Sequence, residues 1–252
     1  MKIEQVGAIT SSVRRFMNTP EEIQEGLKRI RDIGYQAVQI SGIKDYDPKQ
    51  MKQWCDDLGL TICATHEGNM SIVEEPEAVV EKLKTLGTKY TAYPYPHKEP
   101  TDLDTAKEVA AALDKSGAVL AAAGLGLAYH NHDIEFVKVG DKVALEFIYD
   151  NTDPKNLLGE PDTYWIQHGG GDPVTWCEKL KGRLPILHMK DYAMKGKKEP
   201  MMTSIGSGNL DWKRICAAAE ASGCEWYVVE HDGGTFESLE SSFNFIRDHL
   251  CD

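Results

Sequence analysis

The amino-acid sequence predicts an α/β protein that folds as a single (β/α)8 TIM barrel over residues 1–252. Two observations carry this prediction: apolar, strand-like segments alternate with amphipathic helical segments, and eight such strand segments follow one another. The chain length is typical of an α/β barrel built as one domain. An open, doubly wound sheet is the alternative architecture, but no GxGxxG motif follows the first predicted strand.

The first half of the chain shows the alternation most clearly. Thr19 is a helix-capping residue, Pro20 suits the first helical position, and Glu22 strengthens the capping signal. A glycine ends each of the predicted helices. The expected strands are residues 3–9, 35–40, 60–65, 89–95 and 125–130, and the expected helices are residues 20–33, 47–58, 76–86 and 103–123.

The second half continues the pattern after an insertion. A strand-like piece is expected at residues 143–149, before the sixth strand of the alternation. Asp172 and Pro173 start another helix. The remaining expected strands are residues 157–162, 184–190 and 225–230, and further helices are expected at residues 210–221 and 237–250.

Composition excludes several classes of protein. The formal net charge is −12, from 40 acidic and 28 basic residues, and no block of Lys and Arg offers a footprint for nucleic acid. No apolar run approaches the ~20 residues that cross a bilayer. The cysteines form no CxxC pair, which indicates reduced core residues. We expect a soluble, cytoplasmic protein that binds neither nucleic acid nor a membrane.

Polar side chains gather at the carboxyl ends of the predicted strands, where barrel enzymes place their active sites. In LAYHNHDIEF (residues 127–136), His130 and His132 should share one face of a strand, with Asn131 opposite. The other strand ends read THE (65–67), YPYPH (93–97), EPDTYW (160–165), HMKD (188–191) and EHD (230–232). The opposite strand ends carry ordinary surface residues, and this asymmetry indicates an active site.

Four of these residues form a candidate metal site. Asp162, His188 and Glu230 come from three successive strands, and His130 lies on the strand before them. Imidazole and carboxylate donors that converge from several strands suit a divalent cation with positions left open for substrate. Taken singly, each residue also fits a purely structural role. A strand-end Asp often caps the next helix, and a His is often a hydrogen-bonded residue of the barrel wall.

The motifs together resemble the sugar phosphate isomerase/epimerase superfamily, the xylose isomerase-like TIM barrels that include inosose dehydratases, hydroxypyruvate isomerases and ketose 3-epimerases. The resemblance covers nearly the whole chain, and the order of the motifs carries it. They are GYQAVQI, ATHEG, YHNHDIEF, EPDTYW with GGGDPV, PILHMKD, GSGNLDW and YVVEHD.

The resemblance implies a divalent metal, often manganese, with zinc, cobalt and magnesium as alternatives. The family's Asp, His and Glu ligands of strands six to eight correspond to Asp162, His188 and Glu230. The chain departs from the family at strand five, where His130 replaces a frequent Glu, and at Gln39, where many relatives have Glu. The first departure weakens a mechanism that uses two carboxylates on opposite faces of the substrate.

The expected chemistry is metal-assisted removal of a proton next to a carbonyl, through an enediolate. Glu230 is the candidate base, and His130 or His132 is its candidate proton partner. Lys190 either binds an oxyanion or is a solvated lysine at a helix entry. The candidate substrate-binding residues are His66, Tyr93, Trp165 and Lys190.

Three functional classes remain open from the sequence. The first is an isomerase or epimerase of a small sugar or sugar derivative, and the second is a lyase that performs β-elimination on a keto-sugar, keto-inositol or 3-keto-glycoside. The third is a non-catalytic sugar-binding barrel. A small carbohydrate is the expected partner in each. A homo-oligomer is left open, and residues 194–202 are a candidate lid or interface.

Overall fold

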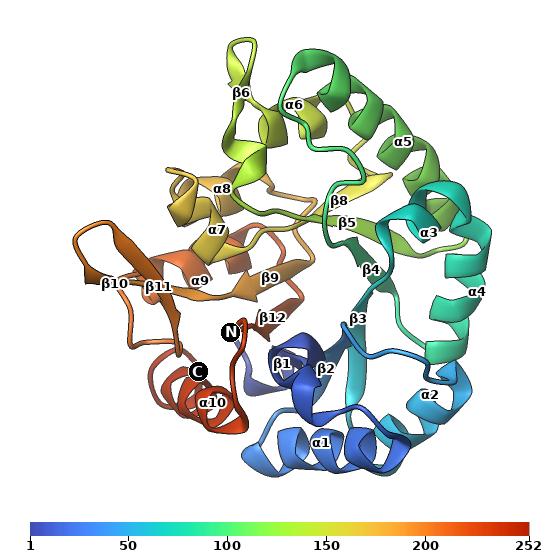
Figure 1. The fold of residues 1–252 in the computed structure, drawn as a ribbon, viewed down its shortest axis with the longest axis vertical. Helices are drawn as coiled ribbons and strands as arrows, with labels where there is room; N and C mark the ends of the chain where they lie inside the picture. Colours follow the sequence, from blue (N-terminus) through green and yellow to red (C-terminus); the bar gives the residue numbers. More distant parts are fainter. Residues whose placement is uncertain (252) are drawn as a thin grey trace.

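Eight parallel strands form the centre of the molecule, as the computed structural model shows for residues 1–251 (Figure 1). Asp252, the last residue of the predicted domain, lies outside the described residues. The sheet runs in the order β8-β5-β4-β3-β2-β1-β12-β9. Its strands are β1 (Val6–Ile9), β2 (Ala37–Ile40), β3 (Thr61–His66), β4 (Tyr90–Tyr93), β5 (Gly126–His130), β8 (Leu157–Glu160), β9 (Ile186–Met189) and β12 (Trp226–Val229).

The two ends of this sheet meet and complete the barrel. The backbone N–H of His188 in β9 donates to the carbonyl of Pro161, just after β8, at 3.0 Å. Asp162 and His188 form an isolated parallel bridge at the same place. The predicted (β/α)8 TIM barrel is therefore confirmed, and two candidate metal ligands lie on the seam that closes it.

Helices surround the strands (Figure 1). Thr19 caps α1 by accepting a hydrogen bond from the backbone of Glu22, as predicted. Gly34 ends α1 with φ +126°, and a Cβ there would lie 2.5 Å from the Phe243 ring. The helices are α1 (Pro20–Ile33), α2 (Pro48–Asp57), α3 (Asn69–Glu74), α4 (Pro76–Leu86), α5 (Leu103–Ala122), α6 (Ala144–Asp150), α7 (Thr163–His168), α8 (Pro173–Lys179), α9 (Trp212–Ala221) and α10 (Phe236–His249).

Strand alternation separates an apolar core from a polar site. Ile186 and His188 share one face of β9, so the face that carries the buried apolar Ile186 carries the histidine at its carboxyl end. Val228 and Glu230 repeat this arrangement on β12 and the residue that follows it. The other strand faces pack against the helices in the main core. The polar residues therefore collect at one end of an otherwise apolar barrel.

The prediction of a strand-like piece at residues 143–149 is wrong, because this segment contains α6. Its buried Leu145, Ile148 and Tyr149 recur at spacings of three and four, which is helical periodicity. The first predicted strand also starts late, since residues 3–5 form the 3-10 helix η1 (Ile3–Gln5).

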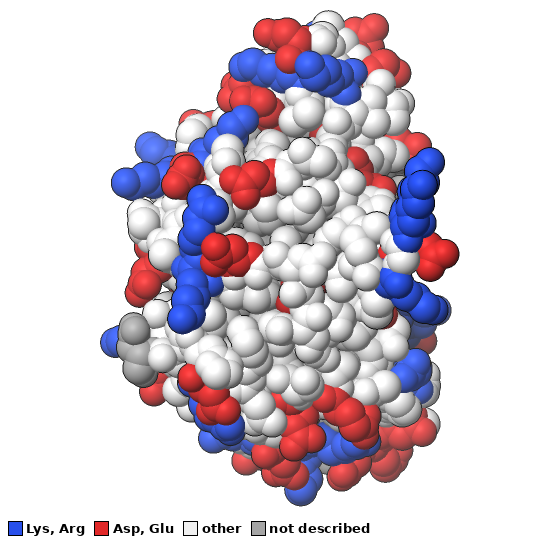
Figure 2. All heavy atoms as spheres, turned by 90° about the vertical axis from the view of Figure 1, so that its left-hand side faces the viewer, with Lys and Arg blue, Asp and Glu red and all other residues white. Residues whose placement is uncertain are grey.

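Two hairpins extend from the barrel. One pairs β6 (Lys138–Val139) with β7 (Lys142–Val143), and the other pairs β10 (Asp191–Gly196) with β11 (Glu199–Thr203). The second hairpin contains the segment proposed as a lid or interface. Figure 2 shows this side of the molecule, where a broad uncharged area is bordered by Lys, Arg, Asp and Glu side chains rather than by a basic patch. None of the helices in residues 1–251 is long and apolar enough to cross a membrane.

Candidate active site

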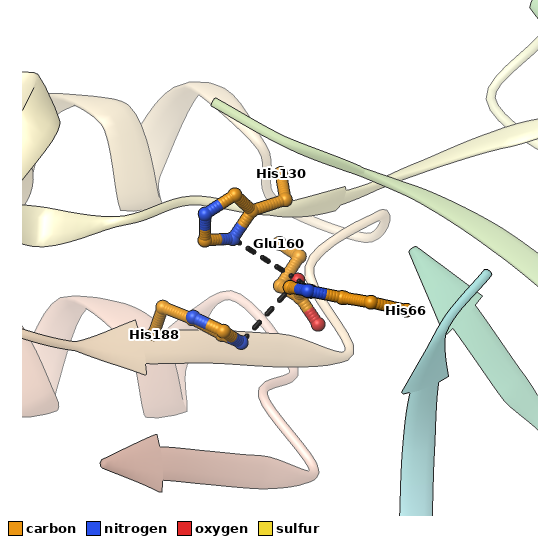
Figure 3. Close-up of side chains that lie close together, drawn as sticks. All are labelled: His66, His130, Glu160 and His188. Atoms are coloured by element: carbon orange, nitrogen blue, oxygen red, sulfur yellow. Dashed lines mark hydrogen bonds and ion pairs between the residues drawn. The ribbon is translucent and has the colours of Figure 1, made fainter. Parts of the chain in front are cut away.

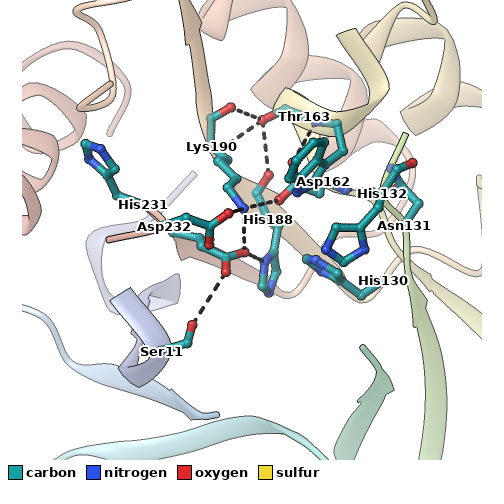
Figure 4. A network of polar contacts seen from close by, with 12 residues as sticks. Ser11, His130, Asn131, His132, Asp162, Thr163, His188, Lys190, His231 and Asp232 are labelled. Atoms are coloured by element: carbon teal, nitrogen blue, oxygen red, sulfur yellow. Dashed lines mark hydrogen bonds and ion pairs between the residues drawn. The ribbon is translucent and has the colours of Figure 1, made fainter. Parts of the chain in front are cut away.

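The four candidate metal ligands lie together at the carboxyl end of the barrel. Figure 4 labels three of them, His130, Asp162 and His188. His130 ends β5, His188 lies in β9, Asp162 follows β8 and Glu230 follows β12. One ligand atom from each lies within 4.8 Å of the others, and all four residues are buried. Four strands that are distant in sequence thus deliver one cluster of two imidazoles and two carboxylates.

The two carboxylate oxygens of Asp162 have different roles: one caps a helix and the other faces the site. Its Oδ1 accepts a hydrogen bond from the backbone of Trp165 at 3.0 Å and caps α7. Its Oδ2 is buried without a hydrogen-bond partner, 3.7 Å from Lys190 Nζ. Asn131 fixes the backbone, because its Oδ1 accepts from the Asp162 N–H at 3.1 Å. Helix capping and a role in the site are therefore compatible for this residue.

His188 is held between acceptors on both sides of its ring. Its Nδ1 lies 2.8 Å from Glu230 Oε2, and its Nε2 lies 2.7 Å from Gln39 Oε1. Burial disfavours the charged ring, but Glu160 and Glu230 outweigh it and raise the pKa of His188 to about 10. Without a metal, the ring is therefore an imidazolium that donates from both nitrogens.

Glu160 is a site residue to which the sequence analysis assigns no role, although it begins the EPDTYW motif (Figure 3). The sequence analysis also does not predict Ser11, Arg14 and Ser41, which line a cavity beside this cluster. Glu160 is fully buried at the end of β8, and its Oε2 accepts from His66 Nε2 at 2.6 Å. The same oxygen lies 3.2 Å from His130 Nδ1 and 3.3 Å from His188 Nε2. The available signal was spacing, because Glu160 and Asp162 are two residues apart and point to the same side of an extended chain.

The charge of Glu160 is stabilised by its neighbours. Its Oε1 accepts a hydrogen bond from Gln39 Nε2 at 2.7 Å. Burial opposes ionisation, but His188 and His66 together hold the pKa of Glu160 well below its ordinary value. Gln39 therefore connects Glu160 with His188.

Lys190 lies inside the site and is 1% exposed, which excludes the alternative of a solvated lysine. Its Nζ lies 2.8 Å from Asp232 Oδ2, 3.6 Å from Glu230 Oε2 and 3.7 Å from Asp162 Oδ2. The ammonium also lies 5.3 Å from the centre of the Trp165 ring. Burial lowers the pKa of Lys190, but the neighbouring carboxylates of Glu230 and Asp162 raise it by more, so the pKa lies above its ordinary value. Lys190 is thus a fixed cation among three carboxylates.

A cavity of about 230 Å³ opens above this cluster. His130 and His132 both line it, with ring centres 5.1 Å apart, as their shared strand face predicts. Burial is the main cause that lowers the pKa of His132 to about 4 and the pKa of His130 well below its ordinary value. Both rings are therefore neutral near pH 7. The full lining is Ser11, Arg14, Ser41, His66, Pro94, His130, His132, Glu230, Asp232 and Gly233.

Three of the four predicted substrate contacts, Tyr93, Trp165 and Lys190, lie outside this lining. Tyr93 is fully buried, and its hydroxyl lies 2.6 Å from His97 Nδ1. The ring centre of Trp165 lies 5.2 Å from the ring centre of His132, which does line the cavity. His66 does line the cavity, with Nδ1 3.2 Å from Ser41 Oγ.

The donor set fits a divalent metal. Asp162 Oδ2 is a buried oxygen without a hydrogen-bond partner, and mixed imidazole and carboxylate donors suit manganese, zinc or cobalt. His130, His188, Asp162 and Glu230 would hold the ion. A second set made of His66, His130, Glu160 and His188 shares both of the imidazoles. Binding at either set requires His188 to lose a proton.

Comparison with known proteins identifies the family. The chain belongs to the xylose isomerase-like TIM barrel family, whose model matches residues 27–249. It is 24% identical to an inosose dehydratase of Lacticaseibacillus casei, covering 78% of each chain. A sugar phosphate isomerase/epimerase from Parabacteroides distasonis superposes with a TM-score of 0.83 and 25% identity, covering 99% of this chain and 96% of that one.

An L-ribulose 3-epimerase structure shares the fold, with a TM-score of 0.70 and 19% identity, over 100% of this chain and 89% of that chain. These relatives are enzymes that isomerise, epimerise or dehydrate. The resemblance found in the sequence is therefore confirmed at the level of the family.

Proposed function

We propose that this protein is a divalent-metal-dependent isomerase or epimerase of a small sugar or sugar derivative that works through an enediolate. The observation that carries the proposal is the cluster of His130, Asp162, His188 and Glu230 at the carboxyl end of the barrel, beside a cavity for a small molecule. A bound manganese or similar ion would supply Lewis-acid stabilisation of negative charge on a carbonyl oxygen.

The side chains divide the remaining tasks. Glu230 lines the cavity and keeps a pKa well below its ordinary value, because Lys190 and His188 outweigh its burial, so it is available as a base. It would take the proton from the carbon next to the carbonyl. Lys190 would remain fixed near the developing negative charge. His66, supported from behind by Glu160, would contact a substrate hydroxyl.

A lyase that performs β-elimination is the second candidate. The specific observation is that the cavity lining contains the carboxylates Glu230 and Asp232, and that His130 lines it where the resemblance to the family implies a Glu. A carboxylate base, Glu230, with an imidazole in the same cavity suits loss of a leaving group at the β-carbon. The 24% identity to inosose dehydratases agrees with this candidate.

Deuterium exchange separates these possibilities. Ketoses and keto-inositols would be incubated with the Mn²⁺-treated protein in D₂O and followed by NMR. Deuterium next to the carbonyl with an altered sugar supports isomerisation or epimerisation, whereas a new conjugated double bond supports elimination. Sugar binding without either reaction would refute both and favour a sugar-binding barrel.

The Glu230→Gln variant should lose exchange by about 10²-fold or more, since it lacks the base. Glu108→Gln is the matched control, because Glu108 forms an exposed ion pair with Lys98 on the outer surface. Equal exchange rates in the two variants would contradict the role of Glu230.

A further inference from the structure

Arg14 lies where two cavities meet. It belongs to the 3-10 helix η2 (Thr10–Phe16), directly after β1. It lines the active-site cavity together with Glu230 and His66. It also lines a larger cleft of about 660 Å³, formed by residues after β1 and β2 such as Lys44 and Tyr46. The guanidinium group is thus within reach of a molecule in the active site and of any group that extends outwards from it.

The side chain of Arg14 packs against the backbone of Gly42. Gly42 adopts φ +71°, and a Cβ there would lie 2.9 Å from Arg14 Cδ and 3.5 Å from Ser11 Cβ. A side chain at position 42 would therefore displace the arginine as well as strain the backbone. The stem of Arg14 lies against this glycine, and the side chain lines both cavities at their junction.

No carboxylate of the described residues pairs with the guanidinium group of Arg14. Arg14 is an exposed side chain, and within residues 1–251 it forms neither an ion pair nor a side-chain hydrogen bond, although Glu230 and Asp232 line the same cavity. Those two carboxylates are directed to Lys190, at 3.6 and 2.8 Å. The other cation of the site, His188, is bonded to Glu230 as well. An anion that enters the cavity would therefore find Arg14 available.

We propose that Arg14 is a specificity-determining residue that binds an anionic group, a carboxylate or a phosphate, on the substrate. This inference rests on the proposed function, because it assigns the substrate class of the same site. The reacting carbons would lie beside Glu230, and the anionic end would point to the cleft. A planar guanidinium suits both groups, since it binds two oxygens at once.

The test compares three six-carbon ketoses that differ at one end. D-Fructose is neutral, D-fructuronate carries a carboxylate, and D-fructose 6-phosphate carries a phosphate. Dissociation constants would be measured by calorimetry with Mn²⁺ present. The wild type should bind one of the anionic sugars about tenfold or more tightly than D-fructose, and the identity of that sugar distinguishes carboxylate from phosphate.

Arg14→Gln should abolish this preference for an anionic sugar over D-fructose, and Arg14→Lys should restore part of it. Arg15→Gln is the matched control, because Arg15 carries the same charge, lines the outer cleft without lining the active-site cavity, and rests on Phe16. It should keep the preference.

Binding of the three sugars with equal affinity, or equal losses in the Arg14 and Arg15 variants, would overturn the role of Arg14 and leave the proposed function standing. A wild type that binds none of the three would overturn both.

Discussion

Glu160→Gln tests whether buried charge holds the site together before a metal binds. The change keeps the shape of the side chain and removes one negative charge from a fully buried position. It removes the carboxylate that accepts the 2.6 Å hydrogen bond from His66 Nε2, and it leaves the His188 imidazolium with one carboxylate fewer, at 3.3 Å. Removing one partner of a buried pair costs about 3–5 kcal/mol.

For a protein of this size, that loss lowers the melting temperature of the metal-free protein by about 6–20 °C. The assay is thermal unfolding by circular dichroism in the presence of a chelator, at pH 7. Glu108→Gln makes the same substitution in an exposed ion pair with Lys98, which is worth at most about 1 kcal/mol. If the two variants melt at the same temperature, the cluster around Glu160 contributes no stability and the reasoning fails.

Two further predictions concern stability. The pKa of His188 is raised from its ordinary value of 6.5 to about 10 in the folded protein. The protonated ring therefore contributes fully to the free energy of unfolding below pH 6.5, and this contribution is lost as the pH rises through about 10. Denaturant titrations of the metal-free protein should show this decline between those pH values, and a flat profile would contradict it. Gly117→Ala should lower the melting temperature by several degrees, because its Cβ would lie 1.9 Å from the backbone oxygen of Asn156. Ser116→Ala, next to it on α5, adds no atoms and should melt close to the wild type; equal melting of the two variants would refute the steric argument.

Local sequence signals predict most of the fold. Capping at Thr19 and a terminating glycine locate α1 at the residues expected, and α4 is also found at its predicted bounds. The segment at residues 143–149 could not be assigned in the same way, because a short apolar run fits a strand or a buried helix. The hairpin of β10 and β11 follows the seventh barrel strand as an insertion, which the strand–helix alternation does not predict.

For the candidate site, the sequence predicts which strand ends converge but not the contacts that their side chains make. Strand ends predict that Asp162, His188 and Glu230 converge, since parallel strands present their carboxyl ends at one rim, and the structure brings them together. Whether a carboxylate faces into the barrel also depends on where its strand ends. The two-residue spacing from Asp162 indicates the side on which Glu160 lies, but its contacts with His66 and Gln39 exist only after the barrel closes.

Metal content is the most direct test of the proposed metal site. The protein would be stripped with a chelator, incubated with Mn²⁺, Zn²⁺ or Co²⁺, desalted and analysed by elemental mass spectrometry. The Asp162→Ala/His188→Ala variant is the test protein. Asp248→Ala/His249→Ala, at the exposed end of α10, is the matched control.

We predict near-stoichiometric metal in the wild type and the control, and none in the test variant, with folding of each checked by circular dichroism. A wild type that binds no metal even with excess cation would contradict the metalloenzyme account, as would equal metal content in all three proteins.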